Sequence, residues 1–239
     1  MQRYVSPELT HFVGKGLSKD KQYSVLVKDI LKGGCLKFPP IDDNRCLEGL
    51  SGILPIMGGT RLSGDDTEAA YSQRVCFCDI PITDLEIHMK KYSPFGLSFL
   101  KRFLIDKGAN PVLYVAENSQ ALSFRLPEST SDEPWPRKRV FERNIELFEK
   151  YHQENQGKIP IYLRYFLDIL VFPFIKYFDD SSSDEDEANV YMEREWRVIG
   201  DVEFALSDVH RVFMPERYAE RFRADLPDYK GQLTFSDNI

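Results

Sequence analysis

The feature that most constrains the fold is the alternation of short strand-like runs with helical patterns along most of the chain. Strand-like runs occupy residues 9–13, 75–80, 95–99, 111–115, 195–199, 202–206 and 209–214. Apolar residues at helical spacing lie between or after them, at 23–31, 83–92, in the segment closed by Gly108, and at 216–223. No internal repeat interrupts this order. Short strands interleaved with helices are typical of the α+β class, and we predict a single domain spanning residues 1–239.

Two parts of the chain depart from the alternation. Residues 37–73 are rich in Gly, Pro and Asp and indicate a long irregular excursion. At about 117–178 we predict an insertion that consists of a polar linker, 127–138, and two helical segments, at 140–153 and within 159–178. The apolar part of the second segment carries Arg164, Asp168 and Lys176, which favours a buried helix over a membrane span.

Composition narrows the class of protein. The chain is 42% hydrophobic and 29% charged, as in ordinary soluble globular proteins. The N-terminus lacks the apolar run of a signal peptide, so we expect a cytoplasmic location and no membrane association. The four cysteines contain no CxxC pair, which favours reduced core residues and no metal site. Cys76 and Cys78 are expected on one face of their strand.

Most of the net charge of −7 is local, because residues 179–187 alone hold six acidic side chains. We predict a mobile acidic loop at 179–189. Such a loop is either simply solvated or holds a basic partner. The basic clusters Lys90-Lys91, Lys101-Arg102 and Arg137-Lys138-Arg139 either follow a phosphate backbone or are solvated faces.

The segment 191–197 reads Tyr-Met-Glu-Arg-Glu-Trp-Arg and carries the strongest chemical signal. If it is extended, Tyr191, Glu193, Glu195 and Arg197 share one face. Paired carboxylates repel each other, which raises a pKa unless a cation or a cationic transition state lies between them. The alternative is a surface strand whose glutamates pair with Arg194, Arg197 or nearby lysines.

Three further side chains are candidates on position alone, and each has a structural alternative. His11 lies on the first strand and is either a ligand-binding residue or a hydrogen-bonded structural histidine. Asp79 ends a strand before Pro81 and is either a polar site residue or a turn former. His88 lies beside Met89 on a predicted helix, where a packing or capping role is the simpler interpretation.

Three separated pieces together resemble the AbiGi family of abortive phage-infection proteins, over most of the chain. The first is Thr-His-Phe-Val at 10–13 with the helix that ends in Ile-Leu-Lys-Gly-Gly-Cys-Leu at 30–36. The second, and most specific, begins with Val-Cys-Phe-Cys-Asp-Ile-Pro at 75–81 and continues through His-Met-Lys-Lys-Tyr at 88–92, Phe-Gly-Leu-Ser-Phe at 95–99 and Gly-Ala-Asn-Pro-Val at 108–112. The third is Glu-Arg-Glu-Trp-Arg at 193–197.

More remotely, this order is similar to DarT-like ADP-ribosyltransferases. The resemblance implies an ADP-ribosyltransferase-like core of short strands with flanking and inserted helices, with NAD as the substrate. It implies that Glu195 is the catalytic glutamate and Glu193 the first member of a Glu-x-Glu pair. His11 would bond the adenosine-side ribose of NAD, and Tyr92 and Phe77 would stack near nicotinamide. We also expect Arg197 either to contact a substrate anion or to keep Glu195 ionised.

Cleavage of the nicotinamide–ribose bond passes through an oxocarbenium-like cation, which a buried carboxylate stabilises. The resemblance therefore predicts a phage-defence toxin that transfers ADP-ribose to nucleic acid or protein. A NAD glycohydrolase differs only in using water as the acceptor. The AbiGi name is also attached to an antitoxin, which predicts instead a non-catalytic protein that binds a cognate toxin.

Overall fold

The computed structural model describes residues 6–37, 74–116, 171–179, 181–183, 186 and 189–239, together with the isolated residues 150 and 154. The chain divides into two compact units. The first contains residues 1–39, 73–112 and 184–239, and the second contains residues 40–72 and 113–183.

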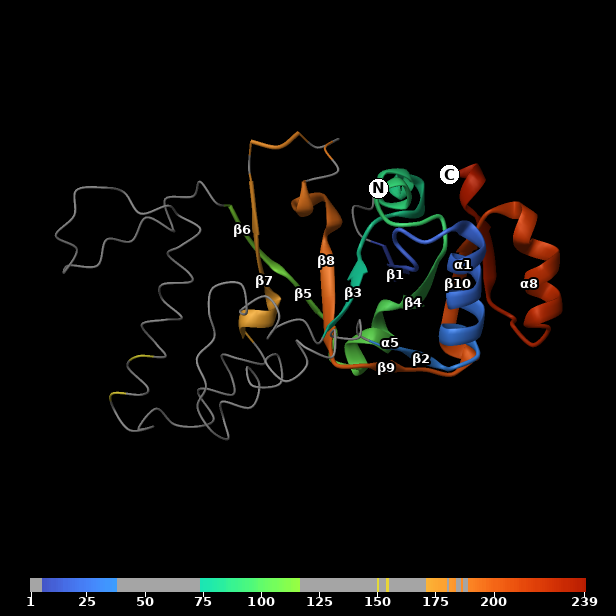
Figure 1. Cartoon of the computed structure of the whole chain (residues 1–239). Coiled ribbons are helices and arrows are strands. Elements are labelled where there is room, and N and C mark those ends of the chain that lie inside the picture. Colours follow the sequence, from blue (N-terminus) through green and yellow to red (C-terminus); the bar gives the residue numbers. More distant parts are fainter. Residues whose placement is uncertain are drawn as a thin grey trace. The chain divides into compact units, whose positions relative to one another are not determined.

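A seven-stranded mixed sheet forms the centre of the first unit (Figure 1). Its strands, in spatial order, are β11 (Gln232–Phe235), β10 (Val209–Met214), β4 (Gly96–Leu100), β1 (Glu8–Phe12), β3 (Arg74–Cys78), β8 (Glu195–Ile199) and β5 (Asn110–Pro111). Neighbouring strands are antiparallel, except that β10 and β11 run parallel. A separate two-stranded ribbon joins β2 (Cys35–Leu36) to β9 (Val202–Glu203).

Alternation along the strands gives this sheet two different faces. One face carries the main core, in which Leu9, Phe77, Leu97 and Val198 are fully or nearly fully buried. The opposite face is more polar. Directly paired residues run across it in the row Glu195, Cys78, Thr10, Ser98 and Arg211.

Helices pack on both faces. On the core face, α1 (Lys19–Ser24) continues into a π-helix, η1 (Val25–Leu31), and α8 (Ala219–Asp225) lies beside α1 (Figure 1). The Tyr23 hydroxyl donates to Asp225 at 2.8 Å and joins these two helices. On the polar face, α4 (Glu86–Lys91) buries Met89, and Leu85 just before it, against Phe213 and Cys78.

The remaining elements of the first unit are short. They are α5 (Lys101–Asp106) and the 3-10 turns η3 (Ile82–Asp84), η7 (Val190–Glu193), η8 (Leu206–Asp208), η9 (Glu216–Tyr218) and η10 (Ser236–Asn238). In the second unit the described residues form a 3-10 turn, η6 (Phe172–Phe174), and a parallel pair of strands, β6 (Leu113–Ala116) and β7 (Ile175–Phe178).

The predicted α+β class is confirmed, and most predicted elements are present within two residues of their expected ends. The run 111–115 is wrong as a single strand, because it is divided between β5 and β6 at Val112. Thr-Asp-Leu-Glu at 83–86 has the sequence pattern of a capping box, which predicts that Thr83 caps a helix. This is wrong, since Thr83 lies inside η3 and Leu85 precedes α4. Residues 38–73 of the predicted excursion, the linker, the first predicted helical segment apart from residue 150, and the second segment up to residue 170 lie outside the described residues. The second segment ends in the turn η6 and the strand β7, so the predicted helix is wrong over Ile175–Phe178.

The single-domain and insertion boundaries, the ADP-ribosyltransferase-like arrangement and the cytoplasmic location stay predictions. Within the described ranges, no helix combines the length and apolarity needed to cross a membrane.

Candidate functional site

The two glutamates of the 193–197 segment are both buried, but they do not lie on one extended strand. Glu193 ends the turn η7, and Arg194 adopts a left-handed conformation with φ 43° and ψ 52°. Strand β8 begins only at Glu195. The prediction that Tyr191, Glu193, Glu195 and Arg197 share one face of a single strand is therefore wrong. Only Glu195 and Arg197 lie on β8, whereas Tyr191 and Glu193 belong to η7. The side chain of Tyr191 is 51% exposed, whereas the other three are buried.

Glu195 and Arg197 form a bidentate ion pair on the polar face of β8. Arg197 Nε donates to Glu195 Oε1 at 2.8 Å, and Nη2 donates to Oε2 at 3.1 Å. The two side chains are only 6% and 4% exposed. This planar two-point geometry is the strongest form of carboxylate–arginine pairing. It agrees with the expected role of Arg197 as the cation that keeps Glu195 ionised.

Glu193 is held by two donors from the same region of the chain. Lys91 Nζ donates to Glu193 Oε1 at 2.8 Å, and the Tyr92 hydroxyl donates to the same oxygen at 2.5 Å. The side chains of Lys91 and Glu193 are 15% and 10% exposed, so the pair is largely withdrawn from water. Burial, followed by the hydrogen bond and the charge of Glu193, raises the pKa of Tyr92.

The Tyr92 ring lies on the polar face of the sheet. It stacks on Phe12, with ring centroids 6.2 Å apart and planes 7° apart. The ammonium groups of Lys15 and Lys91 lie 4.9 and 5.4 Å from its centroid. Contacts of this kind are cation–π interactions, and they fix the ring beside Glu193.

His11 and Phe77 lie on the opposite, core face. Their ring centroids are 5.7 Å apart, and Phe77 packs edge-on against Phe99. His11 Nδ1 lies 2.7 Å from the carbonyl oxygen of Cys76, to which it donates. Burial lowers the pKa of His11. The structure therefore brings Tyr92, Glu193, Glu195 and Arg197 to one face of the sheet and does not bring His11 or Phe77 to them.

Cys76 lies opposite Arg197 on β3 and adds a thiol to the Glu195 cluster. Burial, followed by the charge of Glu195 and a hydrogen bond to it, raises the pKa of this thiol to about 12. Cys76 and Cys78 are both free thiols, and they occupy one face of β3 as the sequence predicted.

The other candidates have structural partners or structural surroundings. Asp79 is buried, accepts from the Ser6 backbone N–H at 3.0 Å and pairs with Lys101 at 2.7 Å. Both ring nitrogens of His88 are buried and have no hydrogen-bond partner among the described residues. Its ring lies 6.5 Å from Phe12, so a packing role fits it best.

The predicted basic clusters are largely neutralised within the chain. Lys91 pairs with Glu193 and Lys101 with Asp79, while Lys90 and Arg102 form exposed i,i+4 pairs with Glu86 and Asp106. The third basic cluster lies outside the described residues. Sequence reasoning missed Lys91 as a partner of Glu193. The sequence could have indicated Lys91 through its position next to Tyr92, because a residue adjacent to a candidate binding residue often reaches the same site.

The arrangement offers two largely buried ion pairs, Lys91–Glu193 and Glu195–Arg197, rather than an open pair of carboxylates. Glu193 and Glu195 each have their own cation, which removes the mutual repulsion expected from the sequence. These contacts orient both carboxylates and favour their charged form. Any ligand that uses Glu195 must displace or share the Arg197 guanidinium.

Comparison with known protein families identifies a matching family. A family model described as "Putative abortive phage resistance protein AbiGi, antitoxin" matches residues 66–232, more than half of the chain. The matched region includes Tyr92, Glu193, Glu195 and Arg197 but not His11. No curated protein and no solved structure matches the chain. On the extent of the family match, this chain belongs to the AbiGi family.

Proposed function

We propose that this protein is the antitoxin of an abortive phage-infection system, which binds a cognate toxin and neutralises it without catalysis. The observation that carries the proposal is the bidentate pair between Glu195 and Arg197. The family description supports the same function.

The pair argues for a structural use of Glu195. A carboxylate that stabilises a ribosyl cation acts through oxygens aimed at the reacting carbon. Here both oxygens accept from a guanidinium two residues along the same strand, in a position that is buried on all sides. Releasing that guanidinium inside the protein costs several kcal/mol, roughly as when a buried ion pair is broken.

The position of His11 supports the same conclusion. In the enzyme interpretation His11 and Glu195 act on one NAD molecule. In this fold Thr10, Cys78 and Glu195 are paired across one face, so His11 points to the other. The residues proposed to bind NAD are thus divided by the sheet.

The acidic stretch at 179–189 supplies a candidate contact for a basic toxin surface. Of its described residues, Asp179, Ser181 and Asp186 are exposed. Asp179 accepts from the backbone and the hydroxyl of Ser181, at 2.9 and 2.7 Å, which leaves its charge at the surface. Complementary charge of this kind steers association between proteins.

A second function is favoured by one observation, the gathering of Tyr92, Glu193 and Glu195 on one face. These three residues support a NAD-dependent mono-ADP-ribosyltransferase that modifies nucleic acid or protein, or a NAD glycohydrolase. In that case Glu195 stabilises the ribosyl cation, and Glu193 orients or deprotonates the attacking nucleophile. Arg197 would have to leave Glu195 when NAD binds.

One experiment separates the two functions. The wild-type protein and Glu195→Gln are expressed alone in a bacterial host, and the purified proteins are assayed for NAD consumption with total RNA, DNA and cell lysate. Glu8→Gln is the matched control, because Glu8 is a buried carboxylate on the same face that pairs with Arg211. Circular dichroism establishes that each variant is folded.

For an antitoxin we expect harmless expression and no NAD consumption by any of the three proteins. Neutralisation of the co-expressed cognate toxin should then survive Glu195→Gln if the variant folds. Toxicity and NAD loss that disappear in Glu195→Gln, but persist in Glu8→Gln, would overturn the antitoxin proposal. The nature of the ADP-ribosylated product would then distinguish a transferase from a glycohydrolase.

A further inference from the structure

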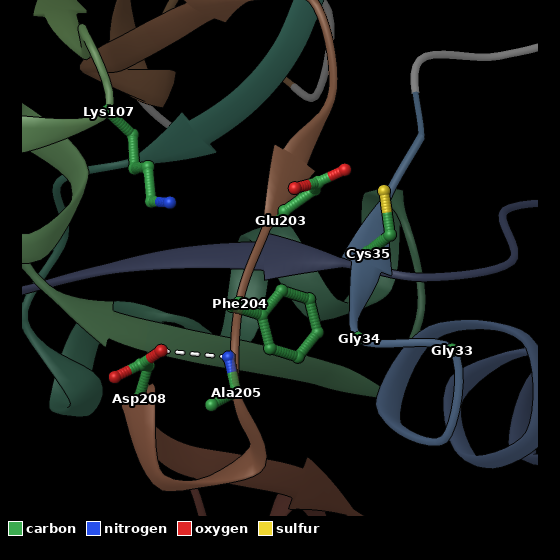
Figure 2. A pocket seen from close by; sticks show the side chains of 8 residues that line it. All are labelled: Gly33, Gly34, Cys35, Lys107, Glu203, Phe204, Ala205 and Asp208. Atoms are coloured by element: carbon green, nitrogen blue, oxygen red, sulfur yellow. Dashed lines mark hydrogen bonds between the residues drawn. The ribbon is translucent and has the colours of Figure 1, made fainter.

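A surface cavity of about 450 Å³ lies in the first unit, and Glu193, Glu195 and Arg197 are not among the residues that line it (Figure 2). Its wall combines the end of η1 and the start of β2 (Gly33, Gly34 and Cys35), the end of α5 (Lys107), and residues of β9 and η8 (Glu203 and Asp208). A volume of this size holds one long side chain or a small molecule.

The backbone of the cavity wall carries negative potential. The helical run from Lys19 to Leu31 ends just before Gly33 and Gly34, and α5 ends just before Lys107, so two helix C-termini meet the cavity. The C-terminus is the negative end of a helix dipole. It keeps that sign here although the carbonyl groups of Ile30, Leu104 and Ile105 accept from the N–H groups of Gly34, Ala109 and Gly108. Gly34 has φ +65°, and a Cβ there would lie 2.9 Å from the Phe204 carbonyl oxygen, so backbone alone forms this part of the wall.

The side chains add to this potential. Glu203 is exposed, and its carboxylate has no hydrogen bond or ion pair to the described residues. Asp208 Oδ2 accepts from the Ala205 N–H at 2.8 Å, drawn as a dashed line in Figure 2, and its other oxygen remains for a ligand. Burial, followed by the charges of Asp201 and Glu203, raises the pKa of the Cys35 thiol.

Lys107 is the one cation among the cavity's lining residues. Its ammonium group lies 5.5 Å from the centroid of the Phe103 ring, which occupies part of its charge through a cation–π contact. The lining therefore carries two carboxylates, two helix C-termini and one lysine already engaged by an aromatic ring.

We propose that this cavity receives a basic side chain, arginine or lysine, of the toxin that the protein neutralises. That the partner is a toxin rests on the proposed antitoxin function. The affinity of the cavity for a cation does not depend on that function. Glu203 provides the free carboxylate, and Asp208 with the helix ends surrounds the remainder of the cation. Cys35 lies against the bound side chain and reports on its presence.

The chemistry is tested first without the toxin. The ¹⁵N-labelled full chain is titrated at low salt with N-acetyl-arginine amide, and N-acetyl-glutamine amide is the neutral control. We expect shifts of the Gly34, Cys35 and Ala205 amides with the arginine probe alone, and an affinity about threefold weaker in Glu203→Gln, as for a partly exposed ion pair. Glu220→Gln on α8 is the matched exposed control. Equal shifts with both probes, or no effect of Glu203→Gln, would overturn the cavity assignment.

The partner is tested next by neutralisation and pull-down of the cognate toxin. Glu203→Lys should weaken its binding and expose Cys35 to iodoacetamide in the mixture, while Glu220→Lys should do neither. Toxin binding that is unchanged in Glu203→Lys overturns the docking role even where the arginine probe binds. Failure of the wild type to bind any toxin refutes the proposed function and the assignment of the toxin as partner. The titration with N-acetyl-arginine amide still decides whether the cavity binds a cation.

Discussion

Glu195 and Arg197 lie two residues apart on β8, and the guanidinium donates to both oxygens of the carboxylate at 2.8 and 3.1 Å. Because successive strand residues alternate between faces, this spacing is the shortest that places both side chains on one face. The same pairing that orients Glu195 also withdraws its oxygens from a ligand. The stability of the fold and the availability of Glu195 to a ligand are thus coupled through Arg197.

Glu195→Gln should lower the free energy of unfolding by about 3 kcal/mol, because the buried guanidinium of Arg197 loses its charged acceptor. Arg197→Met alone should cost a similar amount by leaving the carboxylate without its cation. The double variant should lose less than the sum, by roughly 1–3 kcal/mol of coupling. Urea unfolding of the four proteins measures this cycle. Strictly additive losses would show that the two side chains are not a functional pair in solution.

Tyr92→Phe should cost about 2 kcal/mol, since the lost hydroxyl donates to a charged and nearly buried acceptor, Glu193. The matched control is Tyr229→Phe, in which the lost hydroxyl donates to the neutral carbonyl oxygen of Gln232 at 3.1 Å. That change should cost only about 1 kcal/mol. Thermal or urea unfolding compares the two variants, and equal losses would contradict a special contribution from Glu193.

The sheet was predictable from the sequence because its strands are short apolar runs with strong local signals. Strands β1, β3, β4, β8 and β10 and the helix α5 were all predicted near their observed positions. The edge strand β11 was not, because Gln232–Phe235 is only four residues long and pairs in parallel with a strand more than fifteen residues earlier in the chain.

The candidate site was only partly predictable. Periodicity places Glu195 and Arg197 together on β8. It cannot reveal the left-handed conformation of Arg194, which keeps Glu193 out of that strand. The separation of His11 from Glu195 depends on the register between β1, β3 and β8, which is a tertiary property. Lys91 reaches Glu193 across 102 residues, a distance that no sequence window covers.

Stability should fall in acid through His88. Burial, opposed by the charge of Glu193 and reinforced by that of Lys91, lowers its pKa to about 4 from an ordinary value of 6.5. Because the unfolded chain then binds the proton more readily than the folded one, the stabilisation is complete above pH 6.5 and is lost as the pH falls towards 4. We expect this to contribute about 2 kcal/mol between pH 7.5 and pH 4.5.

The control for this pH dependence is His88→Leu, which keeps an apolar side chain under α4 and removes the titrating ring. Urea midpoints measured from pH 4.5 to 7.5 should vary less with pH in this variant than in the wild type. A residual slope is expected from His11, whose pKa burial also lowers. An unchanged pH profile would show that His88 is protonated equally in both states.

Thr83→Ala should change the free energy of unfolding by less than about 0.5 kcal/mol, as for an ordinary surface substitution. The sequence pattern alone predicts a larger loss, because Thr83 and Glu86 have the spacing of a capping box. Among the residues that the structure describes, the Thr83 hydroxyl instead donates to Asp84, at 3.3 Å, and it does not cap α4. Asn189→Ala is the informative comparison. The Asn189 side chain accepts from the Tyr191 N–H at 3.1 Å and caps the turn that positions Glu193, so its loss should lower the free energy of unfolding by about 1 kcal/mol. Urea unfolding of both variants decides the matter, and a loss in Thr83→Ala as large as that in Asn189→Ala would mean that α4 begins at Thr83 in solution.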